Sequence, residues 1–271
     1  MSLKGKLLVL LIGGILTMTA CSDVHSSRAG ETSSVQQTTA PESSEPEEIT
    51  SVSVGHKTPE EYGKVIALTF DDGPNTTTTG EVLDVLEKYG VRGTFFLIGD
   101  NINEQSAENV KRAYKMGCEI ANHSKTHSYM NKMSAEDIKA EIEFTNEKIK
   151  EIVGTEPKFF RPPYIAVDKN MFDSIDLTFI SGYGCEDYEV KVTAEQRYQR
   201  TMDQVKDGAI ILLHDQQGNF QTVQALEMII PELLDQGYEL VTCSELFFAK
   251  GVELRPDNDI VYSYAEQTTM Y

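Results

Sequence analysis

The strongest constraint on the fold is an alternation, from residue 64 onward, of short apolar runs with segments of helical periodicity. Short apolar runs are typical of buried strands, and apolar residues spaced three and four apart are typical of helices. A βαβα alternation favours a parallel sheet, either open or closed into a barrel. The predicted strands are 65–70, 93–98, 119–121, 159–160, 177–180, 209–213 and 238–241. The predicted helices are 78–89, 107–116, 135–152, 194–205 and 223–234.

Glycines and a capping residue set several of these boundaries. Gly90 and Gly117 are predicted to end the first two helices. Ser134 is predicted to begin the third helix, with Asp137 three residues later as a variant of the capping box. One folded domain is therefore expected over residues 59–250, and the tail 251–271 has no clear pattern and stays unassigned.

The first 58 residues predict export and a flexible connection. Residues 1–21 combine two lysines with an apolar core that is too short for a comfortable membrane span. The run that ends in Cys21 resembles a bacterial lipobox, which implies cleavage before Cys21 and a lipid on its sulfur; an ordinary secretory peptide is the alternative. Residues 22–58 are rich in Ser, Thr, Glu and Pro and predict a disordered tether. The expected location is the outer face of the cytoplasmic membrane, or the medium if the chain is secreted.

Charge and cysteine content restrict the function further. The chain has 24 basic and 43 acidic residues and a net charge of −19, which argues against nucleic-acid binding. Cys118, Cys185 and Cys243 have no CxxC spacing and do not look like metal ligands. Either one bridge or three buried thiols fit this odd number.

Polar side chains follow the predicted strands at the point where each strand ends. They are Asp71, Asp72, His123, Arg161, Asp187 and His214. In α/β barrels the catalytic groups gather at the carboxyl ends of the strands. The sequence therefore predicts that these side chains share one rim.

The imidazoles of His123 and His127, together with the carboxylates of Asp71 and Asp72, predict a metal-dependent hydrolase. His123 and His127 are four residues apart, so on a helical turn both rings would lie on one face. Asp72 is the best third ligand, because catalytic zinc takes three protein ligands and leaves one position open. Asp71 could then act as a base if a turn brings both carboxylates to one pocket. The alternatives are a surface turn at Asp-Asp-Gly-Pro and an unrelated pair of surface histidines.

Three other residues suggest a general acid, a carboxylate that orients it, and an arginine that pairs with a carboxylate. His214 follows an apolar strand and could protonate a leaving group near neutral pH, with Asp187 orienting it. Arg161 precedes two prolines and could pair with a carboxylate and keep it ionised. A structural histidine and a solvated arginine in a surface turn are the alternatives.

Taken together, these motifs resemble the polysaccharide deacetylases, carbohydrate esterase family 4. The resemblance covers roughly residues 60–250 and rests on Thr69-Phe70-Asp71-Asp72-Gly73-Pro74, His123-Ser124-Lys125-Thr126-His127, Arg161-Pro162-Pro163-Tyr164 and Leu212-Leu213-His214. It implies a distorted (β/α) barrel, which agrees with the α/β alternation.

Carried over by position, the resemblance implies a role for each motif residue. Asp72, His123 and His127 would hold a divalent metal, usually zinc, although cobalt or another ion can serve. Asp71 matches the general base and His214 the general acid.

The remaining family positions would support these groups or contact the substrate. Arg161 would keep the base ionised, and Asp187 would pair with the acid. The positions implied to bind the substrate or its oxyanion are Tyr164, Leu212, Pro163 and Tyr188.

One motif departs from the family pattern and leaves the substrate open. The family usually has Asp-x-x-Asp-Trp where this chain has Gly184-Cys185-Glu186-Asp187-Tyr188, and the chain has no tryptophan. The expected function is hydrolysis of acetyl groups on N-acetylated amino sugars of a cell-wall polysaccharide, with peptidoglycan preferred, by a membrane-tethered monomer. The alternatives are an O-acetyl esterase on acetylxylan-type polymers and a non-catalytic glycan-binding module on the same fold.

Overall fold

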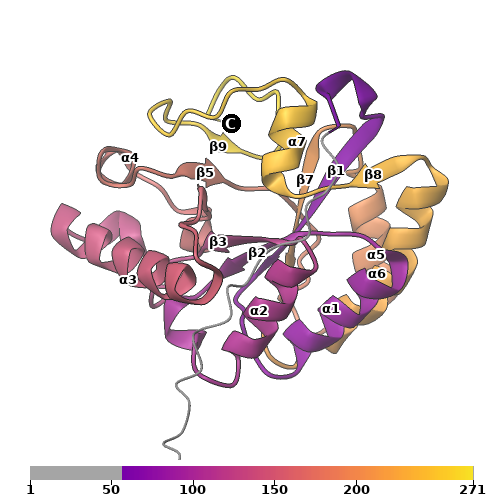
Figure 1. Ribbon diagram of the computed structural model, residues 1–271, viewed down its shortest axis with the longest axis horizontal. Coiled ribbons are helices and arrows are strands. Elements are labelled where there is room, and N and C mark those ends of the chain that lie inside the picture. Colours follow the sequence, from indigo (N-terminus) through magenta and orange to yellow (C-terminus); the bar gives the residue numbers. More distant parts are fainter. Residues whose placement is uncertain (1–56, 271) are drawn as a thin grey trace, which may run out of the picture. The chain divides into compact units, whose positions relative to one another are not determined.

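Nine short strands form one parallel sheet in a computed structural model that describes residues 57–270 (Figure 1). The strands are β1 Lys64–Asp71, β2 Thr94–Leu97, β3 Glu119–Asn122, β4 Phe159–Phe160, β5 Thr178–Ile180, β6 Tyr183–Gly184, β7 Ala209–His214, β8 Tyr238–Leu240 and β9 Val261–Tyr262. The predicted signal segment 1–21, its Cys21 and nearly all of the predicted tether 22–58 lie outside the described residues.

Strand β1 lies near the middle of the sheet and pairs with three other strands. Neighbours run β6-β7-β1-β2-β3-β4-β5-β9, β8 also pairs with β1, and every one of these pairs is parallel. The sheet is curled and carries helices on its outer face (Figure 1), which confirms the predicted α/β fold of the distorted (β/α) barrel type.

Seven α-helices accompany the strands within the described residues. They are α1 Thr78–Tyr89, α2 Ala107–Lys115, α3 Ala135–Val153, α4 Lys169–Ser174, α5 Ala194–Met202, α6 Phe220–Asp235 and α7 Cys243–Ala249. Short 3₁₀ turns lie at Pro59–Glu61, Gly99–Asn101, Met130–Lys132 and Pro163–Ile165.

The core divides at β1, because successive side chains of a strand point to opposite faces. Ile66, Leu68 and Phe70 belong to the apolar cluster shared with α1, α2, α5 and α6. Val65 and Ala67 belong to a second cluster, which α7 closes from inside the curve of the sheet. The alternation places the side chain of Asp71 on this inner side, at the carboxyl end of the strand.

The tail after residue 251 completes the sheet. Its strand β9 pairs with β5, where Phe179 is in register with Val261. The residues that follow reach β7, since Ile210 N donates to Ser263 O at 3.0 Å. The segment that the sequence left unassigned therefore connects two strands that lie far apart in the strand order.

The predicted helix boundaries hold where a specific cap defines them. α1 ends at Gly90, whose φ of 64° is left-handed, and Gly117 has a φ of 83°. Asp137 N donates to Ser134 Oγ at 3.2 Å at the start of α3. Where no cap was identified the boundary was less accurate: α5 ends at Met202, and α6 already begins at Phe220.

The three cysteines of the described domain are buried and free, so the alternative of a bridge among them is wrong. Burial raises the pKa of Cys118 to about 11 and those of Cys185 and Cys243 to about 12. These thiols are therefore protonated and serve as core side chains.

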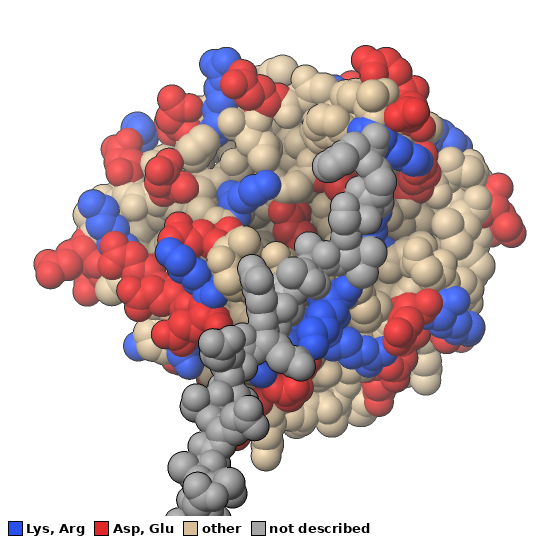
Figure 2. All heavy atoms as spheres, in the orientation of Figure 1, with Lys and Arg blue, Asp and Glu red and all other residues tan. Residues whose placement is uncertain are grey.

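The surface of the described domain is rich in acidic side chains. Figure 2 shows them gathered over α3, whose sequence holds six acidic residues and three lysines.

Within residues 57–270 none of the helices has the length and apolarity needed to cross a membrane.

Candidate metal centre and active site

The carboxyl ends of the strands bring the predicted polar residues to one rim. Asp71 and His214 are the last residues of β1 and β7, and the register of these neighbouring strands pairs them directly. His123 follows β3 and Arg161 follows β4. Since parallel strands end at the same edge of the sheet, four segments distant in sequence meet there.

A sharp turn lets both aspartates of the first motif reach the site. Asp72 has a left-handed φ of 73°, so the chain leaves the extended conformation directly after Asp71. His123 Nε2 then lies 3.7 Å from Asp71 Oδ2 and 3.5 Å from Asp72 Oδ1. The motif is therefore more than a surface turn.

The glycine of this motif is required by a buried carboxyl group that the sequence did not reveal. A Cβ atom on Gly73 would come within 2.5 Å of Asp215 Oδ2. Asp215 is fully buried, accepts a hydrogen bond from Thr79 Oγ1 at 2.5 Å, and has its pKa raised to about 7 by burial. Its backbone N–H also donates to Asp71 O at 3.0 Å, so the residue after His214 fixes the loop after β1.

The two histidines share a loop and not a helical turn, so that prediction was wrong. Ser124 and His127 both have left-handed φ values, 67° and 57°, which interrupt any helix between residues 123 and 127. His127 N donates to Ser124 Oγ at 2.9 Å, and Ser124 N donates to Asn122 Oδ1 at 2.7 Å. This loop places the ring centroids of His123 and His127 4.9 Å apart, with His127 Nε2 3.4 Å from Asp72 Oδ1.

Asp72, His123 and His127 fit a divalent metal ion. One ligand atom of each lies within 4.8 Å of the others, and the buried atoms Asp72 Oδ1 and His123 Nε2 have no hydrogen-bond partner. His123 Nδ1 lies 2.7 Å from Arg161 O, which can only accept, so Nδ1 carries the proton and Nε2 presents its lone pair. Two nitrogens and one carboxylate oxygen form a three-residue set typical of catalytic zinc.

The ionisation states in this cluster also suit a cation. Burial opposes ionisation of Asp72, but the nearby imidazoles, His123 foremost, outweigh it and lower the pKa of Asp72 to about 2. Burial and the neighbouring His123 lower the pKa of His127, which favours the neutral imidazole that binds metal.

Asp71 forms a buried ion pair with Arg161. Arg161 Nη1 donates to Asp71 Oδ1 at 2.6 Å, and both side chains are almost fully shielded from solvent. The guanidinium also donates to Ser181 O and lies over the ring of Phe96, 4.1 Å from its centroid. Asp71 Oδ2 remains directed toward His123, the position a base needs if it is to act beside the metal ligands.

His214 and Asp187 form a second pair across the rim. His214 Nδ1 lies 2.7 Å from Asp187 Oδ1, and His214 N donates to Asp187 Oδ2 at 2.7 Å. Burial by itself would lower the pKa of His214, but the charge and hydrogen bond of Asp187 outweigh it and raise this pKa to about 9. The imidazole is therefore protonated at neutral pH and can serve as an acid.

A buried arginine that the sequence analysis missed supports this pair. Arg197 of α5 donates to Thr222 Oγ1 at 2.8 Å and to the carbonyl of Val192 at 2.9 Å. Thr222 in turn donates to Asp187 Oδ2 at 2.8 Å. The only sequence signal was an arginine on an amphipathic helix, which does not distinguish a buried side chain from a solvated one.

The residues expected to contact the substrate surround this centre. Tyr164 is 55% exposed, has a left-handed φ of 60°, and stacks on Tyr129 with ring centroids 4.0 Å apart. Its ring also contacts His127, at 4.7 Å between centroids. Tyr188 is 53% exposed and lies edge-on to His214 at 5.7 Å.

The other two of these residues differ in exposure. Leu212 of β7 is half-buried, and Pro163 is buried. The analysis of the sequence had not identified Tyr129, which widens the aromatic wall beside His127.

We expect the substitution Asp187→Asn to lower the pKa of His214 from about 9 toward its ordinary 6.5, because burial is then opposed only by the smaller effects of Asp71 and Asp72. Nuclear magnetic resonance titration of chelator-treated protein measures this pKa. Because the folded-state pKa is raised, the pair stabilises the fold fully below pH 6.5 and loses this effect as the pH rises through about 9. Asp235→Asn, at the remote end of α6, is the matched control. A His214 pKa that stays near 9 in Asp187→Asn would contradict the assignment.

Comparison with known proteins agrees with this geometry. A family model described as polysaccharide deacetylase matches residues 58–178. A bifunctional xylanase/deacetylase of Pseudobutyrivibrio xylanivorans is 55% identical over 189 residues, which are 70% of this chain and 31% of that protein. This chain thus spans about a third of that relative's length.

Two further comparisons cover nearly the whole of the other protein. A peptidoglycan-N-acetylglucosamine deacetylase of Bacillus cereus is 40% identical over 68% of this chain and 88% of its own. A family 4 acetyl xylan esterase of Clostridium thermocellum, solved with a cobalt ion, is 43% identical with a TM-score of 0.74, over 75% of this chain and 100% of its own. The chain therefore belongs to the polysaccharide deacetylase family, carbohydrate esterase family 4.

Proposed function

We propose that this protein is a metal-dependent hydrolase that removes acetyl groups from a polysaccharide. The observation that carries the proposal is that three candidate metal ligands lie between two buried ion pairs, one of which can supply a base and the other an acid. Asp71 with Arg161 supplies a carboxylate on one side, and His214 with Asp187 supplies a protonated imidazole on the other.

Each pair suits one step of acetyl hydrolysis. When bound, a divalent ion polarises the attacking water and the acetyl carbonyl. Asp71 accepts the proton of that water through Oδ2, because its other oxygen is held by Arg161. His214 donates its proton to the departing oxygen or nitrogen. The backbone N–H of Tyr164 is proposed to stabilise the oxyanion, and Leu212 to contact the acetyl methyl group.

Ester-linked acetyl groups on a xylan-type polymer are our first candidate substrate. The support is the 55% identity to a xylanase/deacetylase and the 43% identity to an acetyl xylan esterase, against 40% to a peptidoglycan deacetylase. The second candidate is an N-acetylated amino sugar of the cell wall. It is supported by the raised pKa of His214, which keeps the imidazole protonated at neutral pH, because an amine leaving group must accept a proton to depart whereas an alkoxide leaves more readily.

Acetate release tests the activity. Purified protein supplied with zinc or cobalt is expected to release acetate from acetylated xylan or from N-acetylglucosamine oligomers. Chelation should abolish the activity and added metal should restore it. Asp71→Asn should lower kcat by about 10²–10⁴-fold, since it removes the base and keeps the shape of the side chain. Absence of acetate release from every substrate, despite bound metal, would favour the non-catalytic glycan-binding alternative.

His214→Ala separates the two substrate classes. If the substrate is an amide, we expect kcat to fall by about 10²-fold or more, because the amine cannot leave unprotonated. If it is an ester, we expect a loss of about tenfold or less, since an alkoxide leaves more readily. Parallel kinetics on both polymers measure the difference, and equal large losses on both would contradict this distinction.

We also infer from the sequence pattern that the chain is exported and attached to the membrane by a lipid on Cys21. This attachment would hold the domain close to cell-surface or extracellular polysaccharide. Cys21→Ser is expected to move the protein from the membrane fraction of cells to the soluble fraction. An unchanged distribution would exclude the lipid anchor.

A further inference from the structure

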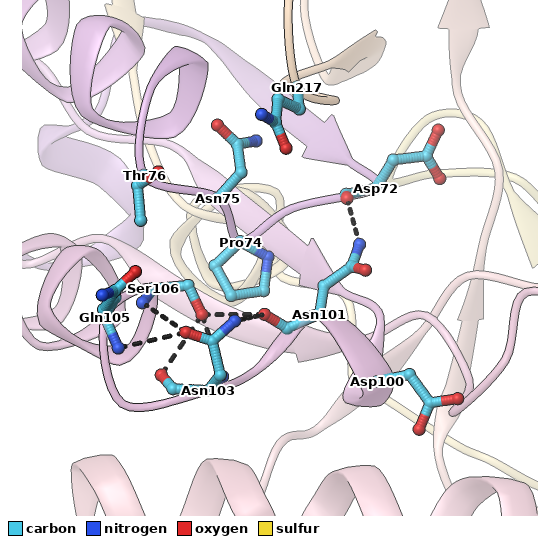
Figure 3. A pocket seen from close by; sticks show the side chains of 10 residues that line it. All are labelled: Asp72, Pro74, Asn75, Thr76, Asp100, Asn101, Asn103, Gln105, Ser106 and Gln217. Atoms are coloured by element: carbon cyan, nitrogen blue, oxygen red, sulfur yellow. Dashed lines mark hydrogen bonds between the residues drawn. The ribbon is translucent and has the colours of Figure 1, made fainter. Parts of the chain in front are cut away.

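A polar pocket of about 300 Å³ lies beside the metal ligand Asp72 (Figure 3). Its walls are the loop that follows β1, the loop that follows β2, and Gln217 after β7. The carboxylate of Asp72 points away from the pocket in Figure 3, whereas its backbone oxygen accepts a hydrogen bond from Asn101 Nδ2 at 2.8 Å. The pocket and the metal centre therefore share one segment of chain but present different atoms.

Hydrogen bonds within the loops fix the shape of this pocket. Ser106 Oγ donates to Asn101 O at 2.7 Å, and Asn103 N donates to Ser106 Oγ at 2.9 Å. On the other wall Asn75 Nδ2 donates to Asp215 O at 2.6 Å. A ligand would meet a preformed surface, which lowers the entropic cost of binding.

The composition of the lining excludes an anionic ligand. Its side chains are amides, hydroxyls, one proline and the carboxyl groups of Asp72 and Asp100, with no basic or aromatic residue. Because the Asp72 carboxylate points away, Asp100 supplies the one charge of this lining, and it would repel a negatively charged group. The lining also has no lysine, arginine or histidine side chain that could pair with such a group.

The helix N-termini next to the pocket do not offset this, because asparagine side chains already accept several of their amide protons. Asn75 Oδ1 accepts from the backbone N–H of Thr77 and Thr79, at 3.1 and 3.3 Å, at the start of α1. Asn103 Oδ1 accepts from Gln105 N and Ser106 N, at 3.1 and 3.2 Å, before α2. These donors would otherwise be available to an anion.

Other groups in the pocket are free to bind. Among the hydrogen bonds of residues 57–270, none involves the side chains of Thr76, Asp100, Gln105 or Gln217. Amide and hydroxyl groups both donate and accept, and a carboxylate accepts. This combination matches the hydroxyl groups of an uncharged sugar, each of which is a donor and an acceptor.

We propose that this pocket is a subsite for an uncharged sugar unit of the substrate chain, close to the acetylated unit at the metal centre. The inference rests on the proposed function and narrows it. Polymers whose neighbouring unit is a neutral sugar should be preferred to those that place a carboxylate there, such as glucuronate side groups or the lactyl group of muramic acid.

The double variant Gln105→Ala/Gln217→Ala tests the subsite. The measured quantity is the ratio of kcat/KM on acetylated xylotetraose to kcat/KM on 4-nitrophenyl acetate, which is too small to fill both sites. Loss of two neutral hydrogen bonds should lower this ratio about tenfold or more. The matched control is Gln236→Ala, at the other end of α6, roughly 24 Å from its start by helix geometry. It should leave the ratio unchanged.

A charge reversal tests the exclusion of anions. Asp100→Lys should raise the rate on a glucuronate-bearing acetylated xylo-oligosaccharide relative to the neutral one by about fivefold. Asp235→Lys is the matched control on a remote exposed position. A preference that is unchanged by Asp100→Lys, or changed equally by Asp235→Lys, would overturn the inference.

The outcomes also separate this inference from the proposed function. If the wild-type protein releases no acetate, the proposed function fails. If it releases acetate and the double variant keeps the wild-type ratio, the activity stands and the subsite is wrong. Calorimetric titration of Asp71→Asn protein with xylotetraose checks binding without turnover, and equal affinity in the triple variant with Gln105→Ala and Gln217→Ala would also contradict the subsite.

Discussion

The buried ion pair between Asp71 and Arg161 is the interaction on which the rest of the site depends. Burying two charges costs several kcal/mol per ion, and removing one partner alone costs about 3–5 kcal/mol, so the pair must be well satisfied. Arg161 meets this requirement in part: its guanidinium also donates to Ser181 O and lies over the ring of Phe96, whereas its buried Nε has no hydrogen-bond partner among residues 57–270. Its own carbonyl accepts from His123 Nδ1 and thereby aims Nε2 at the metal site. One residue after β4 thus orients both the proposed base and a metal ligand.

The acid side of the rim is built from different contacts. Asp187 receives hydrogen bonds from the backbone of His214 and from Thr222, and Arg197 holds Thr222 in turn. These contacts keep the imidazolium beside a carboxylate that raises its pKa. The in-register pairing of Asp71 with His214 on neighbouring strands then sets base and acid on either side of the metal ligands. The strands set the distance between the proposed base and acid, and the loops orient their side chains.

The loop after β1 contributes to both the metal cluster and the proposed sugar subsite. Asp72 contributes its carboxylate to the metal cluster and its backbone oxygen to the wall of the polar pocket. A buried carboxyl group, Asp215, packs beneath this loop and leaves no space for a side chain at Gly73. Movement of the loop would therefore disturb the metal cluster and the proposed sugar subsite together. The same segment can in this way couple the choice of polymer to the position of the acetyl group.

The sequence by itself determined the α/β class, the long helices with their caps, and the residue types of the metal cluster, because periodicity and cap chemistry are local. It did not reveal α4, α7, β6 or β9, which are too short for a periodic signal. Only the tertiary structure decided that His123 and His127 converge through a loop with left-handed residues and that Arg197 is buried. It alone also showed the polar pocket beside Asp72. Each of these features depends on contacts between segments 20 or more residues apart or on backbone conformations that only such contacts can stabilise.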